Sequence, residues 1–274
     1  MSHMSEPAPG VASPARISAL LWCLPAGLLL LTAPLWLHLW EPGMFLALNA
    51  LCAPVPSVLW AGLSLLGNAW GVLGLTAPLL VLAPRLLWAW LCAAPFAIVF
   101  ARVGKALIES PRPAAVVDNS QMRVVGELLH NVSMPSGHTL TAFAVAAGMY
   151  FALPLARRWR HAWLFVLAAG TGLSRIAVGA HWPGDVAVGA SLGLLAGLLG
   201  QGLLARLGPQ HLQPQAWSLR AVALLMAVAA YHLASAGLDF AEALPVQRLV
   251  AALVAVASLL VFVRQSAKSA LQAV

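Results

Sequence analysis

Long apolar runs constrain this chain more than any other feature. Of its 274 residues, 61% are hydrophobic and only 8% are charged, and the mean hydropathy is +0.88. An α-helix that crosses a bilayer needs about 20 apolar residues. By that rule the chain has eight predicted spans, near residues 17–40, 58–82, 86–107, 138–155, 162–178, 183–204, 219–237 and 246–263. The sequence therefore predicts an all-α fold, a polytopic membrane helical bundle, and excludes a soluble domain.

The segments outside the spans have simpler interpretations. Residues 1–16 are expected to be a tag remnant followed by a disordered cytoplasmic tail, because a second methionine follows Met1-Ser2-His3 and the next residues are rich in Pro, Ala and Ser. The first apolar run is too long for a signal peptide, so we expect it to remain as a membrane anchor. Residues 44–56, interrupted by Pro54 and Pro56, predict either an interfacial or a re-entrant piece.

The charge pattern indicates membrane topology. A formal charge of +7 and a pI near 10.4 could suggest nucleic-acid binding, but the basic residues lie mostly in short loops and form no exposed basic domain. A cytoplasmic N-terminus would place most arginines inside, as the positive-inside rule expects, and nearly all acidic residues outside. Three distant cysteines, Cys23, Cys52 and Cys92, predict neither a disulfide nor a metal site.

A charged segment between two apolar runs is the first candidate site. It holds Arg175, His181 and Asp185, and ionisable groups at a bilayer edge are costly and usually functional. Asp185 follows His181 by four residues, so its carboxylate can accept a hydrogen bond from one imidazole nitrogen and leave the other nucleophilic. Arg175 adds a planar cation suited to phosphate. A structural ion pair would have the same spacing, so this segment alone leaves both readings open.

Two more segments extend the pattern. Lys105 and Arg112-Pro113 follow the end of an apolar run, and Pro135-Ser136-Gly137-His138 immediately precedes another. In chain order the three segments read Lys-x6-Arg-Pro, Pro-Ser-Gly-His and Ser-Arg-x5-His-x3-Asp.

These three motifs together resemble the type 2 phosphatidic acid phosphatase (PAP2) superfamily, specifically its bacterial integral-membrane lipid phosphatases. The resemblance implies a six-helix PAP2-like transmembrane catalytic core over residues 17–206. Residues 207–274, a C-terminal transmembrane hairpin, lie beyond that core. We expect the hairpin to pack on the outside of the core and to contribute to stability, a dimer contact or the lipid entrance.

The resemblance also implies the role of each site residue. His181 would attack phosphorus, Asp185 would fix its tautomer, and His138 would protonate the leaving group and then activate water. The phosphate-binding residues would be Lys105, Arg112, Ser136, Gly137 and Arg175. The physical chemistry agrees at Ser136-Gly137-His138, because the N-terminus of a helix favours an anion. No metal and no cofactor are expected, since Mg²⁺ would need more carboxylates and the arginines would repel it.

The predicted function is a metal-independent membrane lipid phosphatase that works through a phosphohistidine intermediate. The charge pattern places its site on the outer face of the bacterial inner membrane, toward the periplasm. By resemblance its substrate is undecaprenyl diphosphate, phosphatidylglycerophosphate, phosphatidic acid or the lipid A 1-phosphate. The expected partners are the lipid substrate and the bilayer; nucleic acid is not expected, and a homodimer is left open. A lipid phosphotransferase with the same site is the alternative. A non-catalytic phospholipid transporter is disfavoured because the two halves lack matching broken helices.

Two minor features complete the sequence analysis. Gly189, Gly193 and Gly197 recur every four residues and predict a smooth stripe for close helix packing within the monomer. His130 lies in the polar loop between the first two motifs, where it could contact the substrate.

Overall fold

The structure is a computed structural model that describes residues 18–213, 216–236 and 238–272, with the backbone alone for 264–272. Within these residues every regular element is a helix. The predicted all-α class is therefore confirmed. The proposed tag remnant and tail at residues 1–16 lie outside the described residues.

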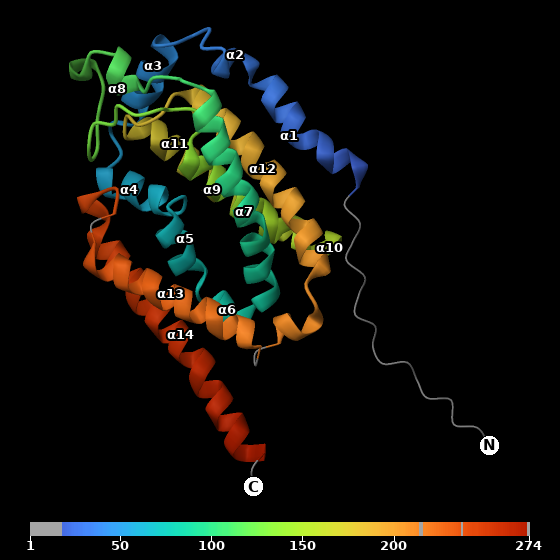
Figure 1. Ribbon diagram of the computed structural model, residues 1–274. Helices are drawn as coiled ribbons and strands as arrows, with labels where there is room; N and C mark the ends of the chain where they lie inside the picture. The colour runs from blue at the N-terminus through green and yellow to red at the C-terminus, as the bar shows by residue number, and fades with distance from the viewer. Residues whose placement is uncertain (1–17, 214–215, 237, 273–274) are drawn as a thin grey trace.

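Five helices form the part of the bundle that carries the motifs. α12 (Pro183–Arg206) packs along α9 (Gly137–Ala152) and α7 (Pro84–Leu107), and α7 also packs against α9. α11 (Trp163–Ala177) lies against α9, and α1 (Ala19–Leu31) lies against α12 (Figure 1). Since α12 contacts all four of these neighbours, it is the central helix of the group.

The glycine stripe on α12 explains how closely it approaches α9. A Cβ on Gly189 would collide with the carbonyl oxygen of Ser136, and one on Gly193 would collide with that of Leu140. A Cβ on Gly197 would overlap the methyl group of Ala147. The predicted packing stripe is confirmed, and it lies within the monomer.

Two of the predicted spans are wrong as single helices. Residues 58–82 form α4 (Ser57–Leu65), α5 (Ala69–Thr76) and α6 (Leu79–Leu82), because the Asn68 side chain accepts hydrogen bonds from the first amides of α5 and Pro78 precedes α6. The described part of the predicted span 17–40, residues 18–40, contains α1 and the short α2 (Ala33–Trp36), whose first turn contains Pro34. Proline lacks the N–H that would continue α1.

Eight full-length spans are not found in the described residues. Four helical segments are long and apolar enough to cross a membrane: Pro84–Leu107, Pro183–Arg206, Trp217–Ser235 and Ala241–Val263. A fifth candidate is the pair α3 (Gly43–Cys52) and α4, bent by 109° at residues 53–56, where the sequence predicted an interfacial or re-entrant piece.

The helices α9 and α11 lie where spans were predicted, but have only 16 and 15 residues. α9 stops just before Leu153-Pro154, because a proline disfavours the helical conformation of the residue that precedes it. α11 stops before Gly179, whose φ is +80°. The remaining short elements are α8 (Pro113–Val116), η1 (Asn119–Gln121), α10 (Leu155–Arg158), η2 (Trp159–His161), η3 (Pro209–Leu212) and η4 (Ala241–Ala243).

The C-terminal hairpin packs on the outside of this bundle. α13 (Trp217–Ser235) and α14 (Leu244–Gln272) contact each other, and both contact α5 (Figure 1). Leu219, Met226 and Val254 are fully buried in this interface. The hairpin therefore shares an apolar core with α5. The connection between α13 and α14 lies at the end of the bundle where α9 begins.

The close approach of α12 and α9 can be tested with a matched pair of glycine substitutions. Gly193→Leu would force a side chain into the backbone of α9 and should destabilise the protein by roughly 1–3 kcal/mol, as overpacking does. Gly202→Leu, on the same helix, points into open space and should have little effect. Thermal unfolding in detergent measures both; equal melting temperatures for the two variants would contradict this packing.

Candidate active site

His181 and Asp185 form the centre of the candidate site. His181 lies in the connection from α11 to α12, where its amide and that of Ala180 donate to the carbonyl of Arg175 at 3.2 and 3.0 Å. Asp185 is in the first turn of α12, and its Oδ2 accepts from the amide of Trp182 at 2.9 Å. His181 Nδ1 lies 3.1 Å from the same oxygen. The predicted pair one helical turn apart therefore exists, and both side chains are buried.

The neighbours of His181 define which of its nitrogens carries the proton. Its Nε2 lies 3.2 Å from Nη1 of Arg112, and a guanidinium can only donate hydrogen bonds. Nε2 must therefore present its lone pair, while Nδ1 donates its proton to the Asp185 carboxylate. This is the tautomer that leaves Nε2 available as a nucleophile.

Charge and burial keep His181 neutral. Its side chain is 2% exposed, and that burial is the main reason why its pKa lies well below the usual value for histidine. The nearby charges of Arg112, Arg175 and Lys105 lower this pKa further. The free base persists into acidic solution, as a nucleophilic imidazole requires.

Sequence reasoning missed Ser133, a buried residue three positions before Ser136. Its hydroxyl donates a short hydrogen bond to Oδ2 of Asp185 and lies 3.3 Å from Nδ1 of His181. Ser133 thus fixes the carboxylate that orients the imidazole. Only its place beside the Pro-Ser-Gly-His motif could have drawn attention to it.

Arg112 is held by the polar loop around it. Its Nη1 donates to the carbonyl of Ala180 at 2.7 Å, and its Nε donates to Oδ1 of Asn131 at 2.6 Å. Trp182 Nε1 donates to the carbonyl of Pro111 at 2.8 Å, which ties this loop to the start of α12. The guanidinium is 4% exposed, so it is a fixed cation next to the His181 ring.

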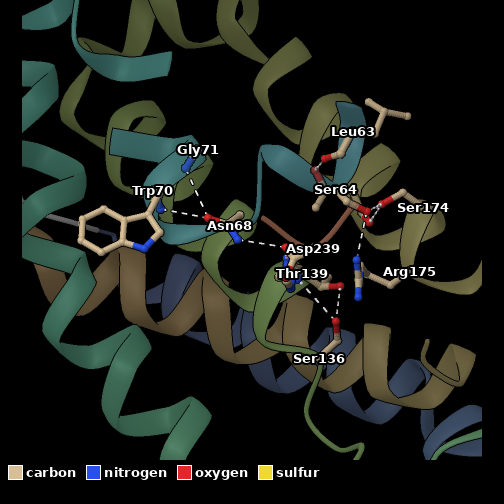
Figure 2. Close-up of polar contacts among 12 residues, drawn as sticks. Leu63, Ser64, Asn68, Trp70, Gly71, Ser136, Thr139, Ser174, Arg175 and Asp239 are labelled. Atoms are coloured by element: carbon tan, nitrogen blue, oxygen red, sulfur yellow. Dashed lines mark hydrogen bonds and ion pairs between the residues drawn. The ribbon is translucent and has the colours of Figure 1, made fainter. Parts of the chain in front are cut away.

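Arg175 provides a second buried cation at the end of α11. Its Nη1 donates to Ser64 Oγ at 3.1 Å, and Ser64 shares a 2.8 Å hydrogen bond with Ser174 (Figure 2). Arg175 is 3% exposed, yet its Nε finds no acceptor within the described part of the chain. A buried donor without a partner is unusual in a folded protein and fits a residue that binds an anionic ligand.

The Ser136-Gly137 motif begins α9, as predicted. Ser136 Oγ caps the helix by accepting from the Thr139 amide at 3.5 Å and from the Thr139 hydroxyl at 2.9 Å (Figure 2). The Ser136 amide donates to the Asp185 carbonyl at 3.0 Å. A Cβ on Gly137 would meet no atom within 4 Å, so its backbone borders open space at the helix N-terminus.

Lys105 and His138 complete the predicted set. Lys105 is half-buried in the last turn of α7, close enough for its charge to lower the pKa of His181. His138 is in the first turn of α9, and its Nε2 lies 2.8 Å from Oδ2 of Asp239. All eight predicted residues thus gather at one end of the bundle. His130 is exposed on the loop.

The arrangement suits an anion better than a cation. Arg112, Arg175 and Lys105 surround His181, and a divalent metal would be repelled by them. Within residues 18–213, 216–236 and 238–272, no three His, Cys, Asp or Glu side chains come together in a way that could hold a metal ion. A buried nucleophile with a fixed tautomer beside several cations can perform phosphoryl transfer.

Comparison with known proteins agrees with this chemistry. Residues 85–205 match the model of the PAP2 superfamily. The decaprenylphosphoryl-5-phosphoribose phosphatase of Mycobacterium tuberculosis is 33% identical over 146 residues, which cover 50% of this chain and 75% of that protein. The lipid A 1-phosphatase of Porphyromonas gingivalis is 43% identical over 68 residues, 25% of this chain but only 15% of that protein.

A solved structure shares the fold. The crystal structure of Aquifex aeolicus LpxE superimposes with a TM-score of 0.50 and 26% identity, covering 58% of this chain and 96% of that one. The chain therefore belongs to the PAP2 superfamily, and its relatives place it among the membrane lipid phosphatases of that family.

Proposed function

We propose that this protein hydrolyses a lipid phosphate or diphosphate by way of a phosphohistidine on His181. The observation that carries the proposal is the environment of His181. Its Nδ1 faces Asp185, its Nε2 faces Arg112, and it is kept neutral among buried cations. That combination supports nucleophilic attack on an anionic phosphorus centre.

In the first step Nε2 of His181 attacks phosphorus, and the bond from phosphorus to the leaving oxygen breaks. His138 gives its proton to that oxygen, so the lipid alcohol or lipid phosphate departs neutralised. Arg112, Arg175 and Lys105 stabilise the charge on the remaining phosphoryl oxygens, together with the amides at the start of α9. A bound phosphate also supplies the acceptor that Arg175 Nε lacks.

In the second step water replaces His181 on phosphorus. His138, now neutral, takes a proton from the attacking water, and inorganic phosphate leaves. Asp185 stabilises the positive charge on the phosphorylated ring through Nδ1. Side chains of this chain supply the cations that stabilise the phosphoryl oxygens, so the proposed reaction needs no metal ion.

An apolar cavity that runs along α9, from Ala142 near the site to Leu153 at the other end, supports a lipid substrate. It has a volume of about 380 Å³ and an apolar lining drawn mainly from α5, α9 and α11. Ala142, one turn along α9 from His138, is part of this lining, and so is Leu66 at the end of α4. An acyl or prenyl tail could lie here while its phosphate reaches the catalytic end of α9.

The names of two relatives support a lipid phosphate as the substrate. One is a lipid A 1-phosphatase, and the other is a decaprenylphosphoryl-5-phosphoribose phosphatase. For this chain we propose a lipid phosphate among undecaprenyl diphosphate, phosphatidylglycerophosphate, phosphatidic acid and the lipid A 1-phosphate. The six-helix core with an added hairpin would cross the inner membrane with its site facing the periplasm. The arginine distribution supports this orientation, because Arg85, Arg157 and Arg206 lie at or beyond the opposite ends of the motif helices.

Removal of each histidine tests the roles directly. His181→Ala should abolish phosphate release from the four candidate lipids, because no nucleophile remains. His138→Ala should lower it roughly 10²- to 10⁴-fold, the usual contribution of a general acid and base. Phosphate release in detergent with EDTA present is the measurement.

His211→Ala is the matched control for these variants. His211 lies in η3, beyond the C-terminal end of α12, which begins at the site and is about 36 Å long at 1.5 Å per residue, so this variant should leave turnover unchanged. Normal hydrolysis by the His181→Ala protein would refute the proposal, and loss of activity only in the presence of EDTA would refute metal independence.

The pH dependence of the reaction tests the charge environment of His181. His181 attacks only as the free base, so kcat/KM falls as pH drops through its pKa, which burial and then the neighbouring cations hold well below 6.5. Arg112→Gln removes one of those cations, so the acid limb should move to higher pH. The ionisation of the lipid phosphate is the same in both proteins, and an acid limb that does not move would contradict the assigned environment.

A further inference from the structure

The contact between His138 and the C-terminal hairpin has no place in the mechanism above. Asp239 lies in the connection between α13 and α14, more than thirty residues beyond the segment that matches the family model. Its Oδ2 lies 2.8 Å from Nε2 of His138. A hairpin that packs on the outside of the bundle therefore delivers a carboxylate to a predicted catalytic residue.

The position of Asp239 is fixed by a second contact. Asn68 Nδ2 donates to Oδ2 of Asp239 at 2.9 Å, while Asn68 Oδ1 accepts from the amides of Trp70 and Gly71 at the start of α5 (Figure 2). One side chain thus caps a core helix and holds the carboxylate. The Asn68 side chain therefore both starts α5 and attaches the connection between α13 and α14 to the core.

The residue that follows Asp239 contacts the site as well. The Phe240 ring is 5% exposed and lies 5.5 Å from Cζ of Arg175, in cation–π range. Figure 2 shows Asp239 and Arg175 in the same cluster of polar contacts. The connection between α13 and α14 therefore reaches both a predicted acid and a predicted phosphate ligand.

The charges around His138 give Asp239 a chemical task. Burial is the main factor that disfavours the charged form of the His138 imidazole, and the cations Arg175 and Lys105 act in the same direction. Asp239 is the carboxylate that faces it and acts in the opposite direction. Burial alone would raise the pKa of Asp239, but the hydrogen bond and charge of His138, with Asn68 and Arg175, hold that pKa below its usual value. Asp239 is therefore an anion at neutral pH.

We propose that Asp239 is a positioning residue for His138: its carboxylate orients the imidazole and stabilises the protonated form that donates to the leaving oxygen. The proposal rests on the function proposed above. In the imidazolium form Nε2–H donates to Asp239, and Nδ1–H is the proton transferred as the bond from phosphorus to the leaving oxygen breaks. The neutral imidazole that results regains a proton from the attacking water.

The need for proton donation by His138 depends on the basicity of the leaving group, so two substrates with different leaving groups test the proposal. An alkoxide from phosphatidic acid needs a proton as it leaves, whereas para-nitrophenolate does not. We would measure kcat and KM for both phosphatidic acid in detergent micelles and para-nitrophenyl phosphate. The proteins are the parent chain, Asp239→Asn, Asp239→Glu, His138→Ala and Glu242→Gln.

Asp239→Asn should lower kcat for phosphatidic acid by roughly 10- to 100-fold, below the full effect of an acid and base, and kcat for para-nitrophenyl phosphate by less than about threefold. KM should change little for either. Asp239→Glu should restore part of the loss because it keeps the carboxylate. Glu242→Gln, an exposed acidic residue in the same connection, should behave as the parent.

Three results would overturn the inference. Equal losses on both substrates would indicate a structural role, and faster turnover in Asp239→Asn would mean that the carboxylate blocks the site. Parental kinetics in Asp239→Asn together with a large defect in His138→Ala would refute the role of Asp239 and leave the role of His138 intact. If the parent released phosphate from none of the four candidate lipids, or if His138→Ala remained fully active, the proposed function itself would fail and this inference with it.

Discussion

The carboxylate of Asp185 is the interaction on which the rest of the site depends. Its Oδ2 receives hydrogen bonds from the Trp182 amide, from the Ser133 hydroxyl and from Nδ1 of His181. The carbonyl of the same residue accepts from the Ser136 amide. Asp185 therefore joins the first turn of α12, the polar loop and the start of α9, and it orients His181 while doing so.

The close packing of α12 against α9 makes this junction possible. Glycines at 189 and 193 let α12 approach the backbone of α9 closely, so the N-termini of both helices meet. One terminus carries Asp185 and the other carries the Ser136-Gly137-His138 motif. These two rigid helices thereby hold His138 and the carboxylate that orients His181, more precisely than loops alone would.

The sequence predicted the family and the set of residues at the candidate site better than it predicted the helices. The ordered motifs identified the eight candidate residues because phosphoryl transfer needs particular residue types near one another, and the structure brings those residues together. The long helices α7, α12 and α13 also follow from apolar length. The breaks around Asn68 and Thr32 could not be predicted, because apolar residues continue through them and only local capping and proline geometry end the helices.

The contributions of Ser133, Asn68 and Asp239 were also invisible in the sequence. Each is a common polar residue with no distinctive spacing, and Asp239 is separated from His138 by 101 positions. Its contact arises from the packing of the hairpin against α5, which is a tertiary event. The hairpin was expected to contribute to stability, a dimer contact or the lipid entrance, and the structure also gives it a direct contact with the candidate site.

The most direct measurement for this account is the location of the phosphoryl group in the covalent intermediate. A His138→Ala protein, in which water activation is impaired, would be mixed with para-nitrophenyl phosphate, whose leaving group needs no proton from His138, and quenched rapidly under alkaline conditions. Peptide mass spectrometry should find an alkali-stable, acid-labile phosphoryl group on His181. A phosphoryl group on Ser133 or on another residue, or turnover that proceeds with no group on the protein at any time point, would contradict the central role of His181.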